Sequence, residues 1–186
     1  MIRKTRIKRT WLAAAVIASG SLLATALPAN AETGVSASEI KLGITLPLTG
    51  AASPGYNKIG NAVNAYFKYV NDNGGVYGRK VTLIQKNDEY SPQLSIAKTN
   101  ELILRDKVFA LVGPLGTANF TAVHKSVGLS KRGVPSLFLN TGFSGFSNKK
   151  SYPSSFMILP SYAMEAKIIA QFLKENHAGK KLGIVY

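Results

Sequence analysis

Strand-like and helix-like segments alternate along most of this 186-residue chain, and that alternation restricts the fold to a small set. The strand-like segments are found at 40–46, 80–86, 108–112, 134–139 and 156–159. Segments with helical features separate most of them. This is the order of βαβ units, in which helices connect parallel strands and cover the sheet. The sequence therefore predicts an open α/β fold with a parallel sheet.

The first helical segments have identifiable signals. Apolar residues recur at three-to-four spacing over 59–70, which predicts an amphipathic helix. Ser91 is a typical N-cap and Pro92 a typical first helical residue. A second helix is therefore predicted from there to about Arg105.

The rest of the chain continues the alternation. A third helix is predicted to end near Gly133, and a fourth to run from a cap at Ser161 to about His177. Residues 181–186 are interpreted as a further strand. Because a strand with no following turn is not a natural terminus, the chain is expected to be the front part of a longer protein.

A basic and then apolar N-terminus predicts export. Five basic residues lie within 3–9, an Ala-rich apolar run covers 11–27, and small residues lead up to Ala31. This is the order of a secretory signal peptide. A membrane-spanning helix is the alternative, but the run is short and Pro28 follows it. We expect cleavage near Ala31 and a periplasmic or secreted protein.

Charge and cysteine content exclude several classes of partner and covalent link. The chain has 23 Lys and Arg residues against nine Asp and Glu. Five of the basic residues lie in the leader, which leaves 18 against nine, a net charge of +9. The surplus is scattered as pairs, so no nucleic-acid partner is expected. The absence of cysteine excludes a disulfide and a lipid-anchored N-terminal cysteine.

Catalytic signals are weak. Asp88 and Glu89 are adjacent and cannot converge as an acid/base pair, so a solvated or helix-capping loop is the simpler interpretation. His124 and His177 lie far apart without metal-ligand spacing. Neither a dinucleotide fingerprint nor a phosphate-binding loop is present. We therefore expect no catalytic residue, no metal and no cofactor.

A ligand is instead expected beyond the carboxyl ends of the strands, where open α/β sheets bind small molecules. The loop at 113–119 is the best candidate. Its glycines let a ligand approach the backbone, and the first helix amides and the Thr117 hydroxyl suit a carboxylate. The alternative is that Thr117 only caps the helix.

Several short motifs occur in a fixed order along the chain. They are Ile40-Lys41-Leu42-Gly43-Ile44, Pro47-Leu48-Thr49-Gly50, Val70-Asn71, Gly74-Gly75-Val76-Tyr77-Gly78-Arg79, Asp88 and the run 108–116. Their order and spacing resemble the Leu/Ile/Val-binding family of ABC-importer solute-binding proteins, which have the type I periplasmic-binding-protein fold. The resemblance covers the chain after its leader. It implies two doubly wound parallel-sheet lobes that close on a ligand.

The resemblance also implies the domain organisation and the first set of ligand contacts. Residues 1–31 are the signal peptide, 32–160 an incomplete N-terminal lobe, and 161–186 the start of the second lobe. Thr117 matches the position whose hydroxyl holds the ligand carboxylate, with Leu115 and Gly116 beside it. Tyr56 resembles the aromatic residue of the first loop, although it could instead pack on that loop.

Further contacts are implied at the end of the fourth strand. Asn140, Thr141 and Gly142 lie where the family has backbone and hydroxyl contacts to amino and carboxylate groups, although Asn140 and Thr141 could also be turn formers. Phe143 and Phe146 could line an apolar pocket or pack in the core.

The implied function is capture of an amino acid or related small carboxylate and its delivery to a membrane ABC permease, by hinge closure of two lobes. A ligand-sensing domain that reports to a receptor or regulator is the alternative, and a hydrolase on a related fold is the third. The ligand itself is not defined, because specificity also depends on side chains of the second lobe.

Overall fold

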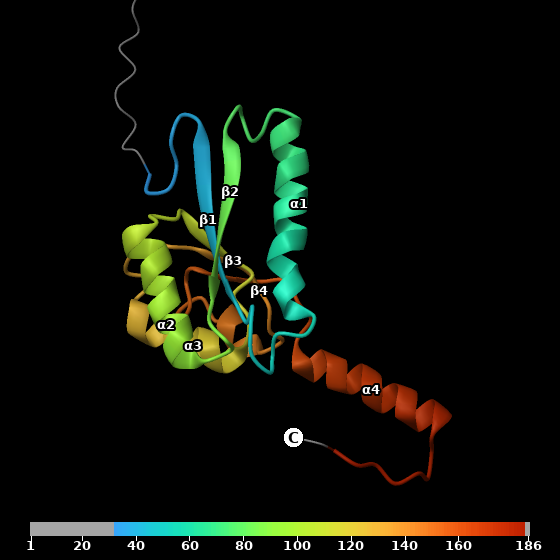
Figure 1. Cartoon of the computed structure of the whole chain (residues 1–186). Helices are drawn as coiled ribbons and strands as arrows, with labels where there is room; N and C mark the ends of the chain where they lie inside the picture. Colours follow the sequence, from blue (N-terminus) through green and yellow to red (C-terminus); the bar gives the residue numbers. More distant parts are fainter. Residues whose placement is uncertain (1–31, 185–186) are drawn as a thin grey trace, which may run out of the picture. The chain divides into compact units, whose positions relative to one another are not determined.

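The structure, a computed structural model, describes residues 32–184 (Figure 1). The predicted leader and its cleavage site lie outside the described residues, as do residues 185–186. No helix within 32–184 combines the length and apolar character needed to cross a membrane.

A parallel sheet of five strands forms the centre of the described chain, in the order β2-β1-β3-β4-β5. The strands are β1 (Glu39–Leu46), β2 (Lys80–Asn87), β3 (Ala110–Val112), β4 (Ser136–Leu139) and β5 (Ser155–Met157). All four pairings are parallel, and β1 and β2 pair along their full length. The predicted parallel α/β fold is confirmed. Because the chain first adds β2 on one side of β1 and then β3 on the other, the topological switch point lies between β1 and β3.

Helices cover both faces of this sheet (Figure 1). They are α1 (Ile59–Asp72), α2 (Pro92–Asn100) and α3 (Thr117–Val127). A fourth helix, α4 (Tyr162–Asn176), has no buried residue, and short helical turns lie at Tyr56–Lys58, Glu101–Arg105 and Ser144–Ser147. The side chains of Ile59, Val63 and Phe67 bring α1 against a small buried cluster around Ile44 and Leu46 of β1. The stripe predicted over 59–70 is thus the face that packs.

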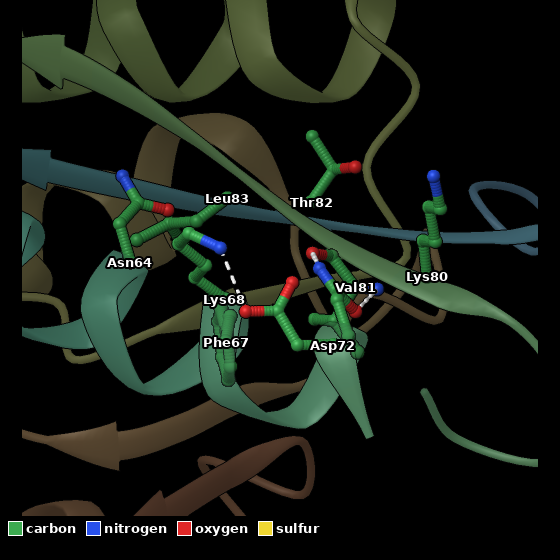
Figure 2. A pocket seen from close by; sticks show the side chains of 9 residues that line it. Asn64, Phe67, Lys68, Asp72, Lys80, Val81, Thr82 and Leu83 are labelled. Atoms are coloured by element: carbon green, nitrogen blue, oxygen red, sulfur yellow. Dashed lines mark hydrogen bonds and ion pairs between the residues drawn. The ribbon is translucent and has the colours of Figure 1, made fainter. Parts of the chain in front are cut away.

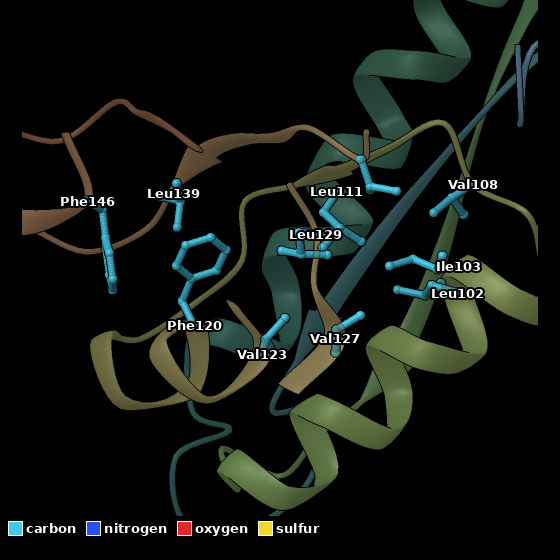
Figure 3. Close-up of a cluster of buried hydrophobic side chains, with 11 residues drawn as sticks. Leu102, Ile103, Val108, Leu111, Phe120, Val123, Val127, Leu129, Leu139 and Phe146 are labelled. Atoms are coloured by element: carbon cyan, nitrogen blue, oxygen red, sulfur yellow. The ribbon is translucent and has the colours of Figure 1, made fainter. Parts of the chain in front are cut away.

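The larger core lies among α2, α3 and the strands (Figure 3). Phe120 of α3 meets Phe146 edge to face, with ring centroids 5.0 Å apart, and both rings are almost fully buried. Burying one such ring contributes about 1.5–3 kcal/mol. Of the two candidate pocket phenylalanines, Phe146 therefore belongs to the core, while Phe143 stays partly exposed beside it.

The second helix begins as predicted and then changes type. The Ser91 side chain accepts a hydrogen bond from the Leu94 amide, and Pro92 occupies the first helical position. From Glu101 to Arg105 the helix widens into a π-helical turn, closed by a bond from the Asp106 amide to the Glu101 carbonyl. The extra residue per turn shifts the buried face, which explains the irregular periodicity of this segment.

Several predicted boundaries are wrong. Strand β3 begins at Ala110 and not at 108, and strand β5 ends at Met157 and not at 159. Helix α3 ends at Gly128, in the left-handed conformation, and not near Gly133. Strand β4 starts at Ser136 because Pro135 has no amide to donate to a strand neighbour. Residues 181–184 form no strand, since they are exposed and pair with no strand of the described chain.

Helix α1 lies beside β2 (Figure 2), and at Val81 one of its side chains occupies the free edge of the strand. The Asn71 amide donates to the Val81 carbonyl at 2.9 Å and accepts from the Val81 amide at 2.8 Å. A hollow of about 410 Å³ lies beside this contact, and its charged pair Lys68 and Asp72 bonds at 2.7 Å. It lies near the amino end of β2, away from the carboxyl ends of the strands. We therefore interpret it as a structural feature and not as the ligand site.

Replacing Asn71 by Leu should lower the free energy of unfolding by about 1–3 kcal/mol, because the buried Val81 amide and carbonyl then lose their partner. Asn64→Leu is the matched control, since it lines the same hollow from the same helix. Urea denaturation of the full-length protein measures both. Equal losses of stability in the two variants would contradict a special role for Asn71.

Candidate functional site

Backbone hydrogen bonds join the loops that follow β3 and β4. The Asn140 amide donates to the Pro114 carbonyl at 3.0 Å, and the Gly116 amide donates to the Asn140 carbonyl at 3.3 Å. Leu115 and Asn140 thereby form a parallel bridge beyond the ends of the strands. The structure thus brings the two groups of predicted site residues, 115–117 and 140–142, side by side next to the switch point.

These residues contribute in different ways. The Leu115 side chain points into the core, so only its backbone is available at this edge. Asn140 uses its backbone to hold the two loops together. Gly142 lies directly under the Tyr162 ring, where a side chain would collide with it. Tyr56 lies in the helical turn before α1, with 42% of its surface exposed.

Three hydroxyl groups form a chain at this edge. The Thr117 and Thr141 side-chain oxygens are 2.6 Å apart, and the Thr141 oxygen is 3.3 Å from the Tyr162 phenol. Thr141 is buried and also accepts a hydrogen bond from the Phe143 amide at 3.2 Å. A hydroxyl has one proton and two acceptor positions. Thr141 must therefore accept from one of its two hydroxyl neighbours and donate to the other.

The N-terminus of α3 is open beside this chain. Its N-cap is Gly116, which has no side chain to accept from the first helical amides. Thr117 is the first helical residue and its hydroxyl bonds to Thr141, so the capping alternative for Thr117 is wrong. Unpaired amides and the helix dipole favour an anion at this place.

Tyr90 belongs to this edge although the sequence reasoning did not single it out. Its ring lies against Gly116, so closely that a Cβ atom at position 116 would be 2.8 Å from it. Glu89 and Tyr90 both have positive φ angles, 50° and 60°, which turn the chain sharply after β2. Such backbone costs about 1–3 kcal/mol per residue and needs support from its surroundings.

A buried polar relay supplies that support. Asp88 is almost fully buried, and its carboxylate accepts from the Tyr90 amide at 3.0 Å and from the Ser95 hydroxyl at 2.8 Å. Asn119 of α3 donates to the same Ser95 oxygen at 2.9 Å. The relay joins the loop after β2 to α2 and α3. The interpretation of Asp88 as a solvated loop residue is therefore wrong.

The phenols of Tyr90 and Tyr162 have opposite pKa shifts. Burial raises the pKa of Tyr90, and nearby Tyr56, Tyr162 and Asp88 raise it further. Hydrogen bonding to the Thr141 hydroxyl lowers the pKa of Tyr162, with help from the Gly142 backbone. Tyr162 was also missed as a site residue. Its signal was weak, because only the fold brings the start of α4 to the end of β4.

Gly116→Ala should destabilise the protein more than Gly128→Ala. Both glycines have positive φ angles, of 90° and 69°, but only position 116 faces the Tyr90 ring, and a side chain at 128 would meet open space. The expected difference is about 1–3 kcal/mol in the free energy of unfolding. Adding Tyr90→Ala should reduce the cost of Gly116→Ala but not that of Gly128→Ala. Denaturant titration of the three single variants and the two double variants measures this, and additive effects at 116 and 90 would contradict the contact.

Comparison with known proteins places the chain in a family. Residues 39–186 match the family described as periplasmic binding protein, and the chain belongs to that family. It is 23% identical to the Leu/Ile/Val-binding protein BraC3 of Rhizobium johnstonii over 165 residues, which cover 89% of this chain and 44% of the relative. The chain thus spans less than half the length of this curated relative.

Solved structures with 25% sequence identity share the fold. A fatty acid ABC transporter substrate-binding protein from Thermomonospora curvata superposes with a TM-score of 0.69, covering 80% of this chain and 36% of that one. A solute-binding protein of an ABC transporter from Rhodopseudomonas palustris, in complex with 3,4-dihydroxybenzoic acid, gives 0.63, with coverages of 75% and 37%. The type I periplasmic-binding-protein fold is confirmed, with part of a first lobe described. These relatives are binding proteins and not enzymes, in agreement with the predicted absence of catalysis.

Proposed function

We propose that this chain is the ligand-capturing part of an extracytoplasmic solute-binding protein that serves an ABC importer. The ligand is a small carboxylate, and its carboxylate group is held at Thr117. The observation that carries the proposal is the chain of hydroxyls from Tyr162 through Thr141 to Thr117 beside the open N-terminus of α3.

The chemistry of this edge favours a carboxylate over other groups. When a carboxylate accepts the Thr117 proton, Thr141 donates to Thr117 and Tyr162 donates to Thr141, so every hydroxyl proton has an acceptor. The backbone N–H groups at the start of α3 can donate further hydrogen bonds to the carboxylate. The names of the relatives agree with this, because leucine, isoleucine, valine, fatty acids and 3,4-dihydroxybenzoic acid all carry a carboxylate.

The same hydroxyl chain gives a route to lobe closure. We propose that 32–160 belong to the first lobe and that the second lobe begins at 161. Tyr162, the far end of the hydroxyl chain, then lies at the junction between lobes. A ligand that orders these three hydroxyl groups also holds Tyr162, and with it the start of α4, in one position. Ligand binding can favour a closed state through this contact.

The remaining site residues have supporting roles in this proposal. Gly116 and Gly142 leave room for the rings of Tyr90 and Tyr162, Leu115 and Asn140 hold the two loops in register, and Tyr56 forms the rim. A membrane ABC permease is the proposed partner. A membrane-spanning or kinase segment in the full-length protein would favour the ligand-sensing alternative. The similar solved structures are described as binding proteins of ABC transporters, which does not favour it.

Thr117→Val should weaken carboxylate binding by roughly ten- to a hundredfold, because it keeps the side-chain shape but removes a donor worth about 1.5–3 kcal/mol to a charged acceptor. Thr117→Ser should retain most of the affinity. Thr121→Val, one turn further along α3, is the matched control. Calorimetric titration of the full-length protein with leucine, hexanoate and 3,4-dihydroxybenzoate measures the effect. Equal affinity in wild type and Thr117→Val would remove Thr117 from the site.

Export gives a separate test of the location. We expect the protein recovered outside the cytoplasm to begin at Glu32, because the small residues ending at Ala31 are a signal-peptidase site. Mass spectrometry of the N-terminal peptide checks this. An intact leader on the exported protein would contradict the proposed processing.

A further inference from the structure

Most of the large exposed side chains on the loops of the ligand edge are aromatic. Leucines at the same strand ends (Leu46, Leu115 and Leu139) are buried in the core and offer no surface to a ligand. The large side chains that remain exposed there are Tyr56 (42%), Tyr90 (43%), Phe143 (43%) and Tyr162 (54%). They come from four separate segments of the chain. A ligand held at Thr117 therefore has rings and phenol hydroxyls nearby, while the exposed aliphatic side chains of Leu159 and Ile168 line a hollow with Gly142 and Tyr162.

Tyr90 is fixed in position before any ligand arrives. The Asp88 carboxylate holds its amide, the relay through Ser95 and Asn119 anchors Asp88, and Gly116 leaves room for the ring. A rigid aromatic surface loses little conformational entropy on binding. The strained left-handed backbone of Glu89 and Tyr90 is already present in the folded protein, so ligand binding does not have to create it.

The three tyrosines approach one another without stacking. Tyr90 lies against Gly116, and Tyr162 bonds to Thr141, which bonds to Thr117, so both rings lie close to the proposed anchor. Tyr56 and Tyr162 also raise the pKa of the Tyr90 phenol. Within residues 32–184, however, no ring-to-ring contact joins any two of them. Rings that lie near one another but do not pack leave faces free for a further flat group.

We propose that Tyr90, together with Tyr56 and Tyr162, forms an aromatic wall that selects an aromatic carboxylate of the benzoate type over an aliphatic one. This inference rests on the proposed function, which supplies the anchor for the carboxylate at Thr117. The ring of the ligand stacks on or meets the edge of the tyrosine rings, and a ring hydroxyl has phenol partners at hand. The aliphatic chain of leucine or hexanoate gains burial but lacks this ring geometry.

The experiment uses a pair of probes that differ in aromaticity but not in size. Benzoate and cyclohexanecarboxylate are titrated calorimetrically into the full-length protein, with leucine and hexanoate as aliphatic references. We expect benzoate to bind more tightly than cyclohexanecarboxylate, by about two- to tenfold. Tyr90→Leu should abolish most of this ratio. Tyr90→Phe should keep it and also controls for folding, because it retains the ring against Gly116.

Tyr66→Leu is the control for loss of a tyrosine, since Tyr66 is exposed on α1 and is not part of the aromatic wall. The inference is overturned if an aliphatic probe binds as tightly as benzoate, or if Tyr90→Leu leaves the benzoate ratio unchanged. In either case, loss of affinity in Thr117→Val would leave the proposed function standing. If Thr117→Val changes nothing, or if none of the carboxylates binds, the anchor fails and the aromatic inference fails with it.

Discussion

The pairing of β1 with both β2 and β3 is the constraint on which the rest of the described chain depends. Within residues 32–184, α1 connects β1 to β2 on one side of it, and α2 then leads from β2 to β3 on its other side. Ile44 and Leu46 of β1 are buried. This arrangement places α1 on one face and α2 with α3 on the other. It also creates the divergence between β1 and β3, beside which the loops of the candidate site meet.

Local signals in the sequence were sufficient for the elements and for part of the site. The cap at Ser91 and Pro92 defines a helix start because capping needs only neighbouring residues. Thr117 and Thr141 could both be placed at the ligand edge in advance, since the carboxyl ends of parallel strands meet at one edge of a sheet, although their hydrogen bond was not predicted. Strand boundaries were less accurate where one residue, such as Pro135, removes a hydrogen-bond donor.

The aromatic part of the site could not be predicted, because it depends on contacts between distant segments. Tyr90 is held by the carboxylate of Asp88, which the sequence alone suggested was solvated. Asp88 is buried only because α2 and α3 bring Ser95 and Asn119 to it. Tyr162 reaches Thr141 only because β5 and the turn before α4 bring the chain back to the end of β4. Polar residues adjacent in sequence to loops are commonly exposed, so burial of this kind has no local signature.

The side-chain amide on the outer edge of β2 has a consequence for behaviour in a crowded compartment. An open strand edge is a template for pairing with another chain, and such pairing leads to aggregates. Asn71 occupies the donor and the acceptor of Val81 in the way that a neighbouring strand would. A second molecule therefore finds the hydrogen-bonding groups at the start of this edge already taken, and the exposed Lys80 precedes Val81 on the same strand. One asparagine thus blocks pairing with a second copy at one residue of the outer edge of β2.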